Sequence, residues 1–168
     1  MIAQLSGHVA AVTEETALVD VGPLVLEVLV PAHTVALLQP LVGTTVRLHT
    51  LLFVDGSVAT GNLVPRLVGF LSAADRDFFH LLNKVKGVST RKALRIMAVP
   101  SDQIAAAIES GDERLLTSLP EVGKRTAAQM VTELRGQVHA FIEATAAPRP
   151  VEALAGPPQL ALEIMVSW

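Results

Sequence analysis

The sequence contains no cysteine and no tyrosine, and aromatic residues make up only 4 % of its 168 positions. Without cysteine, the chain can form neither disulfide bonds nor thiolate metal sites. Its five histidines lack the spacing of metal ligands, so we expect no metal site. Few aromatic rings are available to stack on bases, which argues against single-stranded nucleic acid as the ligand.

Long apolar runs are also missing. The run at residues 24–30 is interrupted by Glu27, and the N-terminus lacks a basic start followed by an apolar core. We therefore expect no membrane contact, no signal peptide and a cytoplasmic location. Hydrophobic residues nevertheless make up 51 % of the chain, which is enough to build a core in one or two small domains.

One unit occurs twice, 34 residues apart, at residues 81–97 and 115–131. Each copy has an apolar helical turn, a short break that contains glycine, a pair of cations and a second apolar run. The break has the length of a tight connection between two helices. The sequence therefore predicts two helix–turn–helix units built to one plan.

The helix after each break is predicted to begin at about Thr90 and at about Lys124. Its first N–H groups have no partner inside the helix and lie at the positive end of the helix dipole, so they favour an anion. The cationic pairs in these first turns are unfavourable unless an anion is bound, which favours the phosphates of a duplex over a packed protein-interaction module. The candidate DNA-binding residues are Gly87, Val88, Ser89, Thr90, Arg91 and Lys92 in the first hairpin, and Val122, Gly123, Lys124, Arg125 and Thr126 in the second.

Charge is segregated along the chain. The net charge of −3 divides into −4 for residues 1–63, +3 for residues 64–142 and −2 for residues 143–168. Five bases follow one another without an intervening acid, namely Lys84, Lys86, Arg91, Lys92 and Arg95. This distribution is typical of a protein that meets phosphate with one face.

A series of short motifs runs through the chain: GFLS at 69–72, FFHLL at 78–82, GV at 87–88, KAL at 92–94, LP at 119–120, VGK at 122–124 and TA at 126–127, together with MIAQLSG at 1–7 and the valine-rich stretch that follows it. In their order these motifs resemble the helix-hairpin-helix proteins, and in particular the RuvA family of Holliday-junction proteins. The resemblance covers about residues 1–142.

This resemblance implies a non-catalytic subunit that binds four-way DNA junctions as a homotetramer or octamer. It further implies a hexameric ATPase, RuvB, that drives branch migration, and a nuclease, RuvC, as a further partner. In the family, an acidic turn lies at the centre of the junction, and the resemblance gives this role to Asp55. An Asp-Gly pair is also a common turn, so Asp55 acting only in a turn is the alternative.

The predicted fold is α+β and multidomain. Residues 1–63 are expected to form a five-stranded OB-type β-barrel, residues 64–143 a tandem helix-hairpin-helix domain, and residues 144–168 a Pro/Ala-rich linker with a short tail; no third domain is recognisable. Strands are expected at 2–9, 16–21, 24–30 and 45–54 and a helix at 31–38. Ser72 or Asp75 is expected to cap the first long helix, Ser101 to cap a helix that Gly111 ends, and the last helix to span 124–143.

Two departures from the family pattern concern the hairpins, which usually carry two glycines around an apolar residue. Ser89 replaces one glycine in the first hairpin, and Glu121 replaces one in the second. Glu121 is expected to weaken phosphate binding unless its side chain turns away. The segment at residues 55–66 is longer than expected and rich in glycine.

The sequence gives less support to a catalytic function. Gly123-Lys124 resembles the end of a P-loop, but Ser118 and Arg125 stand where that motif needs other residues, so we expect no nucleotide cofactor. The alternatives to junction binding are a helix-hairpin-helix DNA glycosylase, for which Asp102 is the nearest catalytic candidate, and a pure protein-interaction module.

Overall fold

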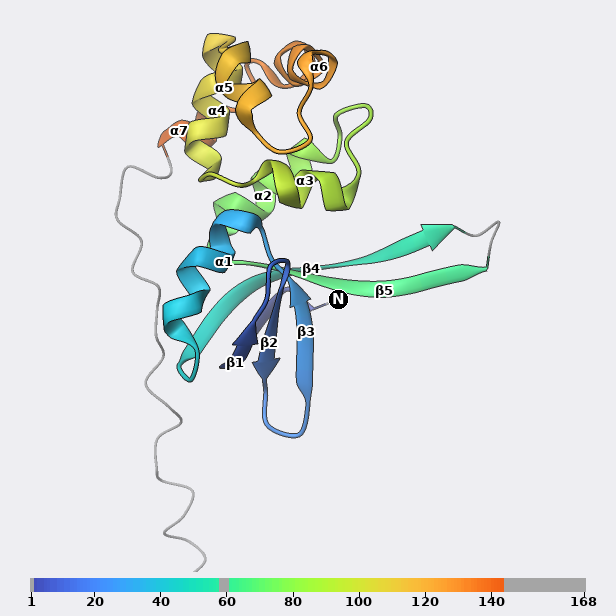
Figure 1. The fold of residues 1–168 in the computed structure, drawn as a ribbon, viewed down its shortest axis with the longest axis vertical. Coiled ribbons are helices and arrows are strands. Elements are labelled where there is room, and N and C mark those ends of the chain that lie inside the picture. Colours follow the sequence, from blue (N-terminus) through green and yellow to red (C-terminus); the bar gives the residue numbers. More distant parts are fainter. Residues whose placement is uncertain (1, 58–60, 144–168) are drawn as a thin grey trace, which may run out of the picture.

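The computed structural model describes residues 2–57 and 61–143, which form a β-barrel followed by a group of helices (Figure 1). The strands are β1 (Gln4–Val12), β2 (Thr16–Asp20), β3 (Val25–Leu29), β4 (Thr45–Ser57) and β5 (Asn62–Phe70). The helices are α1 (Ala32–Leu38), the 3₁₀ turn η1 (Gln39–Leu41), α2 (Ala73–Leu82), α3 (Thr90–Ile96), α4 (Ser101–Ser110), α5 (Glu113–Ser118), α6 (Lys124–Leu134) and α7 (His139–Glu143). The predicted linker and tail, residues 144–168, lie outside the described residues.

The five strands close into a barrel in the order β1-β2-β3-β5-β4. β1 pairs antiparallel with β4, and β3 pairs parallel with β5. Apolar side chains at alternate positions point inward, because successive residues of a strand face opposite sides; Val9, Val19, Val28 and Leu48 are completely buried. This arrangement confirms the predicted OB-type barrel and the α+β fold class.

β4 and β5 extend well beyond the barrel as a two-stranded ribbon (Figure 1). Their pairing runs from His49 opposite Phe70 to Ser57 opposite Asn62, whereas β1 pairs with β4 only as far as His49. The sequence pattern predicts only four strands and ends the fourth at residue 54. The missing strand is β5, which the glycine-rich insertion concealed.

Asp55 lies inside this ribbon, opposite Val64. Pairing continues beyond it to Ser57, so Asp55-Gly56 is not the turn of the hairpin. Gly56 has φ +114°, and a Cβ there would lie 1.7 Å from the carbonyl oxygen of Asn62. Only glycine fits this position, and it brings the two strands together beside Asp55.

The inside of the barrel has a buried cluster of its own, and a second buried cluster joins the barrel to the helices. Leu29, Val68 and Phe70 of the barrel belong to the same buried cluster as the apolar faces of α2, α3, α4 and α6. The rings of Phe70 and Phe79 lie 5.1 Å apart between centroids. β5 ends at Phe70 and α2 begins at Ala73, so only residues 71–72 separate the last strand from the first long helix.

Ser72 caps α2 as predicted: its Oγ accepts a hydrogen bond from the N–H of Asp75. The predicted cap of α4 was wrong, because Pro100 occupies the N-cap position and Ser101 Oγ donates instead to the buried Asp75 carboxylate, 2.6 Å away. Asp75 therefore joins the starts of two helices. Gly111, at φ +71°, ends α4 as expected.

The predicted single helix at residues 124–143 is interrupted. α6 ends at Leu134 and α7 begins at His139. Between them Gly136 adopts φ +81°, outside the right-handed helical region, and its N–H donates to Glu109 Oε2 at 2.9 Å. The backbone already leaves the helix at Arg135, with ψ 133°, and Gly136 permits the left-handed conformation that follows.

Candidate nucleic-acid interface

The sequence repeat is a repeat of structure. α3 and α6 begin at Thr90 and Lys124, as predicted. The same backbone hydrogen bonds recur 34 residues apart in the two loops: Val88 N to Val85 O at 3.1 Å corresponds to Val122 N to Leu119 O at 3.2 Å, and Ala93 N to Ser89 O at 2.8 Å corresponds to Ala127 N to Gly123 O at 2.9 Å. The two units are therefore hairpins of one geometry.

The two loops place glycine at different positions. Gly87 has φ +84°, and the residue that corresponds to it in the second loop is Glu121, at φ +60°. Glu121 is the only residue other than glycine with positive φ in the described part of the chain. A side chain in this left-handed region costs roughly 1–2 kcal/mol, so the surrounding structure must hold it there.

The two hairpins also differ at the N-cap residue of the helix that follows the loop. Ser89 caps α3, and its Oγ accepts from Lys92 N at 3.3 Å. The corresponding residue, Gly123, is extended (φ −86°, ψ 172°) and leaves α6 without a side-chain cap. A Cβ on Gly123 would meet nothing within 4 Å. Gly123 is therefore not required by backbone conformation or by space; it leaves the first N–H groups of α6 uncovered.

The cations of the second hairpin are exposed. Lys124 and Arg125 lie on the surface in the first turn of α6, and neither makes an ion pair within residues 2–57 and 61–143. Lys92 of the first hairpin donates through Nζ to Thr126 Oγ1 at 3.2 Å. This hydrogen bond brings the two hairpins side by side. Two of the predicted DNA-binding residues do not reach that surface: Val88 and Val122 are buried in the hydrophobic core, so their prediction as DNA contacts was wrong.

Arg91, the remaining cation of the first hairpin, is paired with Asp55, the acid predicted to lie at the centre of the junction and called the acidic pin below. Its Nε and Nη2 both lie 3.3 Å from Asp55 Oδ2. The side chains are 53 % and 38 % exposed, so water and ions reach the pair. A groove of about 610 Å³ runs here between the β4–β5 ribbon and the first hairpin, and Asp55, Ser89 and Arg91 are among its lining residues.

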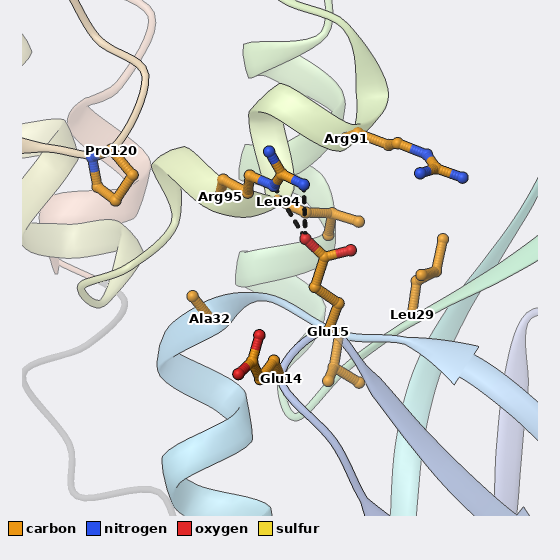
Figure 2. A pocket seen from close by; sticks show the side chains of 9 residues that line it. Glu14, Glu15, Leu29, Ala32, Arg91, Leu94, Arg95 and Pro120 are labelled. Carbon is orange, nitrogen blue, oxygen red and sulfur yellow. Dashed lines mark hydrogen bonds and ion pairs between the residues drawn. The ribbon is translucent and has the colours of Figure 1, made fainter.

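The Glu121 side chain turns to Arg95, a residue that the site prediction omitted. Arg95 Nη1 lies 2.5 Å from Glu121 Oε1, and Arg95 Nη2 lies 2.8 Å from Glu15 Oε1 in the β1–β2 turn. The hydrogen bond with Glu121, and then that with Glu15, raises the pKa of Arg95 above its ordinary value. Figure 2 shows Arg95 next to Glu15. Both residues line a cavity of about 220 Å³ between the barrel and the helices.

Arg95 was visible in the sequence only as the last base of the acid-free run. One sequence signal could have identified it. At corresponding positions of the repeat, the first copy has glycine at 87 and the second copy has an acid at 121. An acid in a tight loop of a cationic surface calls for a local counter-charge, and Arg95 is exposed and one helical turn from Arg91.

Asp102, the catalytic candidate of the glycosylase alternative, lies in the first turn of α4, where the helix dipole favours an acid. Its Oδ1 has no hydrogen-bond partner among the described residues. Among the described residues, no hydrogen bond or ion pair joins it to the hairpin cations or to Asp55. No group of three metal-ligating side chains occurs in residues 2–57 and 61–143, and no helix there is long and apolar enough to cross a membrane.

Comparisons with known proteins agree with this geometry. Residues 1–57 match the RuvA N terminal domain family, and residues 79–135 match the SAM-like helix-hairpin-helix tandem family. A protein of Rhodopirellula baltica is 37 % identical over 141 residues, which are 84 % of this chain and 68 % of that protein. Proteins of Desulfosudis oleivorans and Opitutus terrae are 35 % and 39 % identical, over 86 % and 83 % of this chain and 69 % and 68 % of their own lengths.

All three relatives carry the name Holliday junction branch migration complex subunit RuvA. The two family models cover β1 to β4 of the barrel and both hairpins, and β5 lies between them. With these matches and an OB-type barrel joined to tandem hairpins, the chain belongs to the RuvA family.

Proposed function

We propose that this protein binds four-way DNA junctions without sequence specificity and supports branch migration during recombination and repair. The observation that carries the proposal is the pair of hairpins of one geometry, held side by side and presenting cations at the starts of α3 and α6. Two such hairpins can hold two phosphates of one duplex arm. Contacts of this kind fix position and carry little sequence information.

The second hairpin is the better prepared of the two for a phosphate. Gly123 leaves room beside the first N–H groups of α6, and Lys124 and Arg125 stand exposed in the same turn. In the first hairpin, Ser89 Oγ accepts a hydrogen bond from one of the first N–H groups of α3, and Asp55 forms an ion pair with Arg91. Phosphate must therefore compete with Asp55 for Arg91, whereas no described carboxylate pairs with Arg125.

The ribbon supports a role for Asp55 at the centre of the junction. Asp55 stands on a structure that projects from the barrel next to the first hairpin, so it can lie between duplex arms that the hairpins hold. A carboxylate there repels phosphates and keeps strands apart. A single acid gives a weak pin.

Assembly and partners follow from the family. We infer a homotetramer, or an octamer, whose fourfold symmetry matches the four arms and multiplies weak individual contacts. The relatives are named as subunits of a branch migration complex; in that role this chain is a binding subunit in the cytoplasm, RuvB supplies the ATP-driven motion, and RuvC is the nuclease partner.

The test is to compare binding to a four-way junction and to a linear duplex of equal length at two salt concentrations. Preference for the junction, with an affinity that falls steeply as salt rises, is the expected result. Equal affinity for the two would leave a general duplex-binding protein. Binding to neither would support the interaction module, and release of a damaged base by the protein alone would support a glycosylase.

A further inference from the structure

Arg95 reaches from α3 of the first unit to the loop of the second. All three of its guanidinium nitrogens donate to carboxylates: Nη1 to Glu121, and Nε and Nη2 to Glu15, at 2.9 and 2.8 Å. A guanidinium with this arrangement is already oriented by two acids. Unlike Lys124 and Arg125, it has each of its three nitrogens bonded to a carboxylate, and its charge is balanced by two acids.

Glu121 needs such a partner for two reasons. Its backbone holds a conformation that L side chains avoid, where the repeat has Gly87. Its carboxylate also lies two residues before Gly123 and the phosphate-binding turn of α6. Arg95 draws the carboxylate toward the barrel and neutralises it, so the loop keeps its shape and repulsion of phosphate is reduced.

The first hairpin is held in a corresponding way from the other unit. Residue 129, which corresponds to Arg95 in the repeat, is a glutamine, and its amide donates to Glu133 of α6. Glu133 Oε2 in turn accepts from the N–H of Lys86, next to Gly87, at 3.1 Å. Each loop is thus fixed by side chains from the second helix of the other unit.

We propose that Arg95 is a positioning residue for DNA binding: it holds the second hairpin in its binding shape through Glu121 and makes no phosphate contact of its own. The inference rests on the proposed function and deepens it, because it separates the bases that touch DNA from one that shapes the loop. It also joins the second hairpin to the β1–β2 turn of the barrel through Glu15.

The experiment is a double-mutant cycle on junction binding with Arg95→Gln, Glu121→Gly and both together. Arg95→Gln is expected to weaken binding about fivefold, because an unpaired Glu121 then faces the incoming phosphate. Glu121→Gly is expected to bind at least as tightly as the original protein. In the Glu121→Gly background, Arg95→Gln should change affinity less than about twofold, since residues in one network are not additive.

Two further variants make the cycle specific. Arg95→Lys keeps the charge and should recover part of the affinity that Arg95→Gln removes. Arg76→Gln removes a base that is paired with Asp77 on α2, and it serves as the control for removal of one positive charge. Equal weakening by Arg95→Gln in both backgrounds, with a salt slope reduced by about 0.9, would show that Arg95 binds a phosphate and would overturn the proposal.

Hydrogen exchange of the DNA-free protein provides a readout that does not depend on the proposed function. Arg95→Gln should speed exchange of the amides at residues 119–124, and the Glu121→Gly background should show no further effect of Arg95→Gln. Unchanged exchange in Arg95→Gln would overturn the inference even if the junction is bound. If the original protein binds no junction, the proposed function fails, and the exchange result still decides whether Arg95 shapes the loop.

Discussion

The carboxylate of Asp55 lies 3.3 Å from two nitrogens of the Arg91 guanidinium, so the predicted pin and a predicted phosphate ligand contact each other. The contact joins the β4–β5 ribbon to the first hairpin across the groove between them. In the DNA-free protein, Asp55 occupies the place at Arg91 that a phosphate oxygen would take. We therefore expect Asp55 and the first hairpin to affect DNA binding together.

Replacing Asp55 with asparagine should release Arg91 for phosphate. Binding to a linear duplex is expected to tighten by up to about fivefold at low salt, since an exposed ion pair contributes at most about 1 kcal/mol. The preference for a four-way junction over duplex should fall, because the charge that keeps strands apart is removed. Titrating both DNAs into Asp55→Asn measures the two effects.

Asp77→Asn is the matched control for this change, because Asp77 also pairs with an arginine but lies on α2. It should leave both affinities as they are. If Asp55→Asn left duplex affinity and junction preference unchanged, the ion pair with Arg91 would have no part in DNA binding.

Reversing the charge at Arg125 should weaken binding to all DNA sequences alike, because an arginine that binds phosphate reads no bases. The slope of log affinity against log salt should become less steep by about 0.9 for each phosphate that the variant no longer binds. Arg114→Glu, an equal reversal on the exposed face of α5, is the control. A change of sequence preference in Arg125→Glu would contradict the phosphate assignment.

Gly56→Ala should open the ribbon without unfolding the protein. The new Cβ would meet the carbonyl oxygen of Asn62, and φ +114° is unfavourable for alanine, with a cost of about 1–3 kcal/mol that falls on the ribbon. Faster proteolysis within residues 50–66 at an unchanged thermal midpoint is the expected result. Gly61→Ala, at φ +65° with nothing within 4 Å, should have a smaller effect. A lower midpoint in Gly56→Ala would show that the ribbon supports the core.

Phe79→Ala should lower the free energy of unfolding by about 3–5 kcal/mol, as expected when a buried aromatic side chain is removed. Phe79 is 1 % exposed and packs on Phe70 of the barrel. Denaturant unfolding followed by circular dichroism measures the change. The same truncation at the partly buried Phe53, on the ribbon, should cost clearly less. Equal losses of stability would mean that Phe79 is not central to the packing of barrel against helices.

Short-range sequence patterns, which extend over only a few residues, predicted most of the fold. Alternation of apolar residues located β1 to β3, and Ser72 and Gly111 marked helix ends, because each of these signals acts within a few residues. β5 was missed because Pro65, which lies within it, is unusual in strands, and because the glycines at 56 and 61 that precede it favoured a loop. Its pairing with β4 depends on the positive φ of Gly56, which cannot be inferred from the sequence.

The site was predicted in outline and incomplete in detail. The repeat located both hairpins, because a shared sequence pattern reflects a shared backbone. It did not show that Glu121 takes the left-handed position of Gly87, since the motif places glycine two residues later, at Gly123. The contacts of Arg95 with Glu15 and of Arg91 with Asp55 join residues 80 and 36 positions apart, beyond the range of local patterns.

The core that Phe70 shares with the helices also affects how the protein carries mechanical load. If a motor draws duplex through the junction that this protein is proposed to bind, it pulls on the hairpins. Because only residues 71–72 separate β5 from α2 and both pack in one core, the pull passes to the barrel without a flexible joint that could stretch. Hairpins, barrel and ribbon should then move as one rigid body, so that the position of Asp55 relative to the DNA stays constant while the strands are exchanged.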